Sequence, residues 1–272
     1  MNKIHTVALI YDFDGTLSPG NMQEFGFIQA IGKEPEGFWK KSALLSESQD
    51  ASEILCYMKL MLDEAKASNI KIRREDFRKF GAKIPLYDGV TEWFRLINRY
   101  GEQKGVNIVH YINSSGLTEM IEGTSIYHEF EKVFACSFLY EDGVATWPAV
   151  AIDYTGKTQF LFKINKGVHS IRDHKLVNEY VPEKNRPVPF ANMIYFGDGA
   201  TDIPCMRLVK QFGGHSIAVY NPKTDSRQKA EKLIQEQRVN FACPADYTRY
   251  GRIYRIVTSI IDKIVADQTL EE

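Results

Sequence analysis

The chain has 272 residues, enough for one large domain or for a domain that carries an inserted module around a sizeable core. Hydrophobic residues make up 44% and charged residues 25%, as is ordinary for a globular protein, and the net charge of −1 gives no reason to expect nucleic acid or a membrane as a partner. No signal peptide or membrane-spanning stretch is visible, and the four cysteines are widely spaced without a metal pattern, so we expect a cytoplasmic protein with reduced thiols.

The apolar run from Val7 to Tyr11 predicts a buried parallel strand that ends in two carboxylates. Residues two apart on a strand point the same way, so Asp12 and Asp14 are expected to converge. Neighbouring carboxylates repel each other, and leaving both ionised is costly unless a cation neutralises them or one takes up a proton. A bound cation and a protonated carboxyl group can each take part in catalysis.

A helical segment follows this strand. Residues 17–20 form a turn signal, and from Asn21 to about Gly81 every convincing pattern is helical. The clearest helix is expected over 50–67, with Asp50 or Ser52 as its N-cap. Shorter helices are expected over 22–31 and 73–80.

Strands and helices alternate after Pro85. Strands are expected over 106–112, 132–139, 192–196 and 216–220, with a hairpin-like excursion that ends near Ile152. Helices are expected over 89–100, from Leu117, and over 163–179, 203–210, 224–237 and 254–266.

This alternation predicts an α/β fold with a parallel sheet and helices on both faces. The helical segment interrupts it after the first strand, so we divide the chain into a core over 1–17 and 89–272 and an inserted all-helical module over 18–88. In open sheets of this kind, ligands bind outside the carboxyl ends of the strands.

Four short motifs carry a family resemblance. They are Asp12-Phe13-Asp14-Gly15-Thr16, Ser114 at the end of the second strand, Lys166 in Asn165-Lys166-Gly167, and Gly197-Asp198-Gly199-Ala200-Thr201-Asp202. In this order they resemble the haloacid dehalogenase (HAD) superfamily, with its Rossmann-like core, and in outline its phosphoserine phosphatase branch. The helical module is similar to the C1 cap of HAD phosphatases.

The resemblance implies that Asp12 is a nucleophile that forms an aspartyl-phosphate and that Asp14 is the general acid/base. It also implies Mg²⁺ held by the Asp12 carboxylate, the Asp14 backbone carbonyl and the Asp198 carboxylate. Oxygen ligands suit this hard cation. Asp202 is expected in the metal shell, directly or through water and Lys, although it could also be a helix N-cap before Pro204.

For the substrate phosphate, the strand-then-Ser motif favours Ser114 as a ligand, with Ser115 as the competitor and Gly116 giving clearance. An ordinary helix N-cap is the alternative for these serines. Lys166 is expected to neutralise the phosphoryl group and the nucleophile, with Lys163 as its rival.

The resulting hypothesis is a Mg²⁺-dependent phosphomonoester hydrolase that acts on a small-molecule phosphate ester. Phosphoserine phosphatases carry an acid soon after the first motif, whereas this loop reaches its first acid only at Glu24, so phosphoserine is a poor candidate substrate. The alternatives are a phosphomutase or phosphotransferase on the same core, and a non-catalytic phospholigand-binding protein.

Overall fold

A seven-stranded sheet runs through the protein, for which the computed structural model describes residues 5–224 and 226–271. The strand order is β4-β3-β2-β1-β5-β6-β7, and all neighbours are parallel except the antiparallel pair β3 and β4. This mostly parallel sheet confirms the predicted α/β class. The strands are β1 (Thr6–Tyr11), β2 (Asn107–Leu117), β3 (Lys132–Glu141), β4 (Val144–Val150), β5 (Met193–Gly197), β6 (His215–Tyr220) and β7 (Phe241–Pro244).

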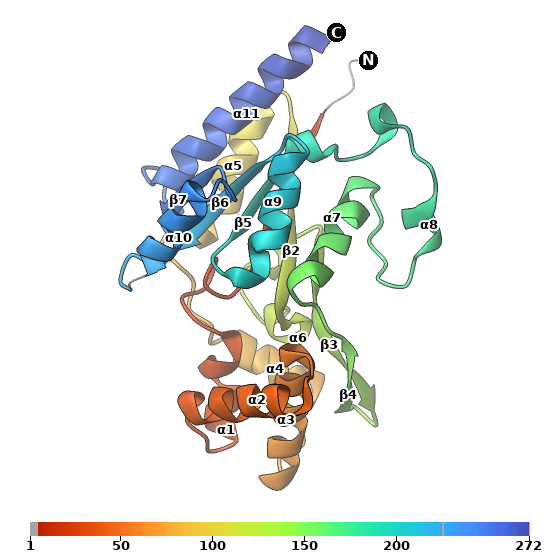
Figure 1. The fold of residues 1–272 in the computed structure, drawn as a ribbon, viewed down its shortest axis with the longest axis vertical. Coiled ribbons are helices and arrows are strands. Elements are labelled where there is room, and N and C mark those ends of the chain that lie inside the picture. Colours follow the sequence, from red (N-terminus) through yellow and green to blue (C-terminus); the bar gives the residue numbers. More distant parts are fainter. Residues whose placement is uncertain (1–4, 225, 272) are drawn as a thin grey trace.

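Helices cover both faces of this sheet (Figure 1). The helices α5 and α11 pack together on one face, while α7, α9 and α10 cover the other. Within the described part of the chain, none of the helices has the length and apolar character that a bilayer-spanning segment needs. These helices are α5 (Val90–Gln103), α7 (Thr158–Asn165), α9 (Ile203–Gln211), α10 (Ser226–Gln235) and α11 (Arg252–Glu271).

The first strand lies at the centre of the sheet because its side chains are apolar on both faces. Val7 to Tyr11 have no exposed surface, and β1 pairs with β2 on one side and β5 on the other. Beyond its last residue, the backbone N–H of Asp12 donates to the carbonyl of Phe196 at 2.9 Å. The carboxyl ends of β1 and β5 are thereby fixed side by side.

The residues between β1 and α5 form a group of helices at the carboxyl end of the sheet (Figure 1). Phe27, Phe38, Phe77 and Phe80 form an aromatic cluster inside it. The group packs on the core through α4 against α6 (Thr118–Ile121) and α3 against β4. Its members are η1 (Met22–Phe25), α1 (Phe27–Ala30), α2 (Pro35–Gln49), α3 (Glu53–Ala67) and α4 (Arg74–Gly81).

The structure differs from the expected helix over 163–179. The helix α7 instead begins at Thr158, after a 3-10 turn at Tyr154–Lys157, and ends at Asn165. Gly167 ends this segment with a φ of +67°, a left-handed conformation that glycine adopts without steric cost. Only the short helix α8 (Lys175–Asn178) lies in the rest of the predicted range.

Candidate active site

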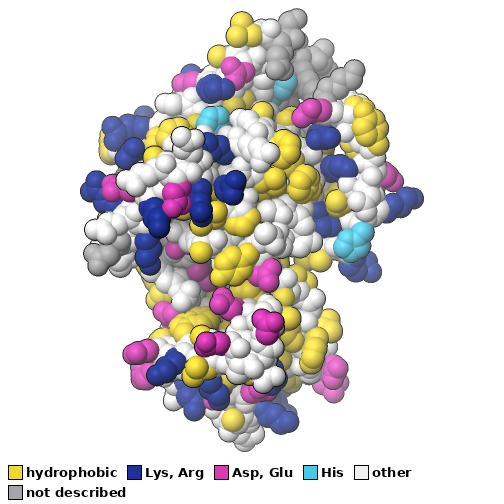
Figure 2. All heavy atoms as spheres, viewed as in Figure 1, with side chains coloured by type: hydrophobic (Ala, Val, Ile, Leu, Met, Phe, Trp, Pro, Cys, Tyr) yellow, Lys and Arg dark blue, Asp and Glu magenta, His cyan; other side chains and the backbone are white. Residues whose placement is uncertain are grey.

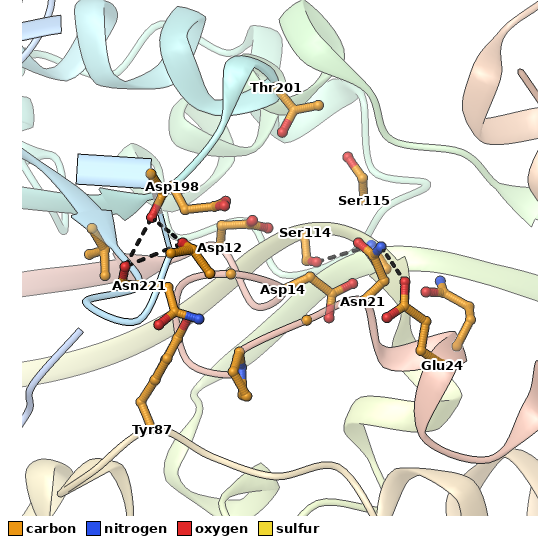
Figure 3. Close-up of a pocket in the computed structure, with 18 of the residues that line it drawn as sticks. Asp12, Asp14, Asn21, Glu24, Tyr87, Ser114, Ser115, Asp198, Thr201 and Asn221 are labelled. Atoms are coloured by element: carbon orange, nitrogen blue, oxygen red, sulfur yellow. Dashed lines mark hydrogen bonds between the residues drawn. The ribbon is translucent and has the colours of Figure 1, made fainter. Parts of the chain in front are cut away.

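A cavity of about 420 Å³ opens where the carboxyl ends of the strands meet the helical group. Its core wall comes from the residues that follow β1, from the end of β2, and from the residues that follow β5 and β6 (Figure 3). Its other wall comes from the helical group, including Gln23, Glu24, Trp39 and Tyr57. Three of the four sequence motifs therefore reach one cavity.

Three carboxylates meet at the core wall of this cavity. Asp12, Asp198 and Asp202 each place an oxygen within 4.8 Å of the others. Gly15 makes room for this arrangement, because a Cβ added there would lie 2.1 Å from Asp198 Oδ2. Gly15 also has a φ of +75°, which disfavours any other residue.

These carboxylates fit a divalent cation by their charge. Desolvation and then the like charge of Asp202 raise the pKa of Asp12 to about 6, against the opposing effect of Lys157. Desolvation and the charges of Asp12 and Asp202 raise the pKa of Asp198 as well. A hard cation between the Asp12 and Asp198 oxygens would neutralise this repulsion, and carboxylates are the ligands that such a cation prefers.

A lysine that the sequence analysis did not select completes the cluster. Lys157 Nζ lies 3.0 Å from Asp12 Oδ1 and 2.6 Å from Asp202 Oδ1. Its side chain has no exposed surface, and the two carboxylates raise its pKa against the opposing effect of desolvation. Lys157 is therefore a buried cation that is ion-paired with both carboxylates.

The expected lysine, Lys166, lies elsewhere. Its Nζ donates to the carbonyls of Val177 and Glu179, and the rival Lys163 donates to the carbonyls of Ser170, Ile171 and Asp173. The helix α7 returns from the carboxyl end of the sheet, so its N-terminal end lies at the cavity and its C-terminal end points away. Lys166 is nine residues beyond Lys157, roughly 13 Å along a helix axis. The expectation that Lys166 lies beside Asp12 is therefore corrected: the lysine in contact with Asp12 is Lys157.

Asp202 is the member of this cluster that does not line the cavity. Besides Lys157, its Oδ1 accepts from the hydroxyl of Tyr195 at 2.8 Å, and its Oδ2 lies 3.4 Å from the N–H of Gly199. The residue has no exposed surface. Although Asp202 stands at the N-cap position of α9, its side chain makes no capping bond to that helix. Its contacts favour a role in orienting Lys157.

Asp14 lies near Asp12 with a different set of contacts. The backbone N–H of Met22, in the first turn of the helical group, donates to its Oδ1 at 3.0 Å. Desolvation, followed by the charge of Asp12, raises the pKa of Asp14 well above its usual value. A carboxyl group with a raised pKa retains its proton more readily, as a general acid requires.

The end of β2 supplies polar groups to the cavity. Ser114 Oγ accepts from the N–H of Gly116 at 3.0 Å, whereas the buried Ser115 Oγ has no partner among the described residues. The carbonyl of Ser115 accepts from the hydroxyl of Tyr57 on α3 at 2.7 Å. A Cβ at Gly116 would lie 2.2 Å from Met22 Cε, so this glycine allows the helical group to approach. The three residues line the cavity together, and the hydroxyl protons of both Ser114 and Ser115 are free to be donated, because Ser114 Oγ only accepts.

Two more residues of the cavity were not expected from the sequence. The Tyr87 hydroxyl and Gln23 Oε1 are buried without hydrogen-bond partners among the described residues, and both side chains line the cavity. Buried polar groups without partners are uncommon and are often satisfied by a ligand. No short motif marks either residue, so only the folded arrangement reveals them. Lys157 lies seven residues beyond the end of β4, and no short motif marks it either.

The mostly parallel sheet and the acids at its carboxyl edge are typical of haloacid dehalogenase-like hydrolases. The family profile described as haloacid dehalogenase-like hydrolase matches residues 9–207. The chain therefore belongs to the haloacid dehalogenase-like hydrolase family. An uncharacterized protein of Borreliella burgdorferi is 30% identical over 282 aligned residues, which cover 91% of this chain and 94% of the relative.

Solved structures share the fold at low sequence identity. A HAD family hydrolase from Salmonella enterica serovar Typhi aligns with a TM-score of 0.61 and 14% identity, over 96% of this chain and 73% of that one. A phosphoserine phosphatase structure described as a phospho-aspartyl intermediate analogue aligns with a TM-score of 0.54 and 16% identity, over 94% and 99% of the two chains. The fold likeness to the phosphoserine phosphatase branch is thus confirmed.

Proposed function

We propose that the chain is a Mg²⁺-dependent phosphomonoester hydrolase that acts on a small phosphate ester through an aspartyl-phosphate at Asp12. The observation that carries this proposal is the contact of Asp12 with Lys157 on one side and its approach to Asp198 on the other. A surface acid would need neither partner. A nucleophile that must approach a phosphate dianion needs both charges offset.

The residues that would hold Mg²⁺ are Asp12 and Asp198 through their carboxylates and Asp14 through its backbone carbonyl. The bound cation would offset the negative charges of the nucleophile and the phosphoryl oxygens, which otherwise repel each other. Asp202 would act from behind, by holding Lys157 against Asp12.

In the first step, a carboxylate oxygen of Asp12 forms a bond to phosphorus while the bond from phosphorus to the ester oxygen breaks. Asp14 gives its proton to the leaving alcohol. In the second step, Asp14 takes a proton from a water molecule whose oxygen attacks the same phosphorus, which releases inorganic phosphate and restores Asp12. Lys157 keeps Asp12 ionised, and the hydroxyl of Ser114, with that of Ser115 as the alternative, would donate to a phosphoryl oxygen.

We propose that residues 18–88 act as a lid that excludes water from this reaction, with 1–17 and 89–272 as the catalytic core. Support comes from the cavity itself, whose outer wall includes Trp39 and Tyr57 of the helical group. We also propose a cytoplasmic location, which the four buried free cysteines favour.

Phosphate release from p-nitrophenyl phosphate tests the proposed function. We expect Mg²⁺-dependent hydrolysis by the natural chain and a loss of at least 1,000-fold in Asp12→Asn. The control Asp63→Asn changes an acid that is 55% exposed on the helical group and should retain activity. Undiminished turnover by Asp12→Asn would refute the mechanism, and transfer of phosphate to a second alcohol without release would indicate a phosphotransferase.

A further inference from the structure

The end of the cavity away from Asp12 contains a carboxylate with a fixed position. Glu24 Oε1 accepts from Trp39 Nε1 at 2.7 Å and from Asn21 Nδ2 at 2.8 Å. Both donors are neutral, and no Lys, Arg or His of the described chain forms an ion pair with Glu24. In Figure 3, Glu24 and Asn21 lie at one end of the cavity and Asp12 and Asp198 at the other, with Asp14 and Ser114 between them. Glu24 is thus placed for the leaving group, beyond the general acid.

The whole cavity has a negative lining. Its charged lining residues are the acids Asp12, Asp14, Glu24 and Asp198, and no basic residue is among the described residues that line it. Lys157 lies behind Asp12 without exposed surface and is already paired with two carboxylates. Figure 2 shows acidic side chains gathered where the helical group meets the core. A bound cation and Lys157 would offset charge at the phosphoryl end, but nothing in the lining offsets Glu24.

A second group at this end also lacks a partner. Gln23 is 2% exposed and lines the cavity next to Glu24 in sequence, and its Oε1 accepts no hydrogen bond from the described residues. A buried acceptor of this kind is satisfied when a ligand supplies a donor. An ammonium group supplies three donors and a positive charge, so it can satisfy both an amide oxygen and a carboxylate.

We infer that the enzyme selects phosphate esters of amino alcohols, whose leaving group carries an ammonium and no carboxylate. Glu24 binds the ammonium by charge and hydrogen bond, Gln23 Oε1 accepts a second hydrogen bond, and Trp39 and Asn21 position Glu24. A carboxylate on the leaving group would meet the negative lining without a basic partner, so amino-acid phosphates are disfavoured. The inference rests on the proposed function, because it concerns the leaving-group end of the same cavity.

Three esters of similar size test this inference with the natural chain and Mg²⁺. They are 2-aminoethyl phosphate, the uncharged n-propyl phosphate, and phosphoserine, which adds a carboxylate. We expect kcat/KM for 2-aminoethyl phosphate to exceed each of the other two by at least tenfold. Equal values for the amino and propyl esters, or a preference for phosphoserine, would overturn the inference.

Variants locate the selectivity. Glu24→Gln removes the charge but keeps an oxygen that can accept from Trp39, and it should lower the ratio of amino ester to propyl ester at least tenfold. Glu36→Gln, an exposed acid on α2 outside the lining, should keep the natural ratio. An unchanged ratio in Glu24→Gln would overturn the assignment. Hydrolysis of p-nitrophenyl phosphate without any amino preference would refute the inference alone, whereas no phosphate release from any ester would refute the proposed function together with it.

Discussion

Replacing Lys157 by methionine removes a buried ammonium that contacts Asp12 and Asp202 while keeping an unbranched side chain of similar length. The change leaves Asp12, Asp198 and Asp202 together without that positive charge. Asp202 keeps the hydroxyl of Tyr195, but Asp12 loses its Lys157 hydrogen bond. We expect both stability and activity to fall.

The size of the effect follows from the two distances. At an effective dielectric constant of about 20, Coulomb's law gives roughly 5 kcal/mol for Lys157 and Asp12 at 3.0 Å, and roughly 6 kcal/mol for Lys157 and Asp202 at 2.6 Å. Desolvation of the three charges offsets much of this attraction, so breaking the cluster should cost about 3–5 kcal/mol of unfolding free energy. Loss of one group that stabilises developing charge typically lowers kcat by a factor of about 100 to 1,000.

Urea unfolding and phosphate release from p-nitrophenyl phosphate measure the two losses. The matched control is Lys166→Met, in the same segment, where the lysine binds only backbone carbonyls. It should lose about 1 kcal/mol and keep its activity within about threefold of the natural chain. Loss of activity in Lys166→Met with near-normal activity in Lys157→Met would refute the assignment of Lys157.

The stability loss in Lys157→Met should also depend on pH in a defined direction. The pKa of Asp12 is already raised to about 6 with Lys157 present, and removing the ammonium raises it further. A carboxyl group whose pKa is higher in the folded state takes up its proton there first, so the folded state gains stability as the pH falls. The difference between variant and natural chain should therefore shrink from pH 7 to pH 5, and a difference that widens would contradict the electrostatic explanation.

Three further outcomes are expected. Gly15→Ala and Gly105→Ala both place alanine at a φ of +75°, which should cost about 1 kcal/mol in urea unfolding. Only Gly15→Ala, whose Cβ would also collide with Asp198, should lose more stability than this and should lose phosphate release. Mg²⁺ at about 100 times its dissociation constant should stabilise the natural chain by about 2.7 kcal/mol in thermal unfolding. Asp198→Asn should abolish this gain in stability. An equal gain in the variant would exclude Asp198 as a ligand. Burial lowers the pKa of His110 from 6.5 to about 3, so the unfolded state takes up the proton first as the pH falls. The natural chain should therefore lose about 2 kcal/mol of stability between pH 7 and pH 5. His110→Gln should not show this loss.

Strand ends were predictable from the sequence because apolar runs followed by acids leave few alternatives. The strands β1 and β5, which Asp12 and Asp198 follow, lie close to their expected ranges, whereas β2 extends to Leu117, five residues beyond its expected end. A parallel sheet necessarily brings the carboxyl ends of these strands to one edge. The helix α2 was harder to recognise, since two of its three buried positions are Ser42 and Ser46. The strand β7 has only four residues, too few for a pattern to emerge.

The lysine could not be placed from the sequence because its role depends on the direction of a helix. Asn165-Lys166-Gly167 resembles the family motif, but it lies at the C-terminal end of α7, which points away from the cavity. Lys157 precedes the same helix, where its N-terminal end meets the cavity. A sequence pattern records which residues are neighbours, whereas the end of the helix that faces the site is set by the path of the chain through the core.

The hydrogen bond from Met22 to Asp14 joins access to the cavity with the strength of the acid inside it. This bond favours the ionised form of Asp14, and its donor belongs to the helical group. Any outward swing of that group that carried Met22 away would remove this bond and would also admit water to Asp14. Because burial influences the pKa of Asp14 more than the bond does, the swing would lower its proton affinity. Closing would thus bury Asp14 and favour its protonated form once an ester is enclosed, while the Met22 bond limits the rise in its pKa and keeps the proton available for transfer.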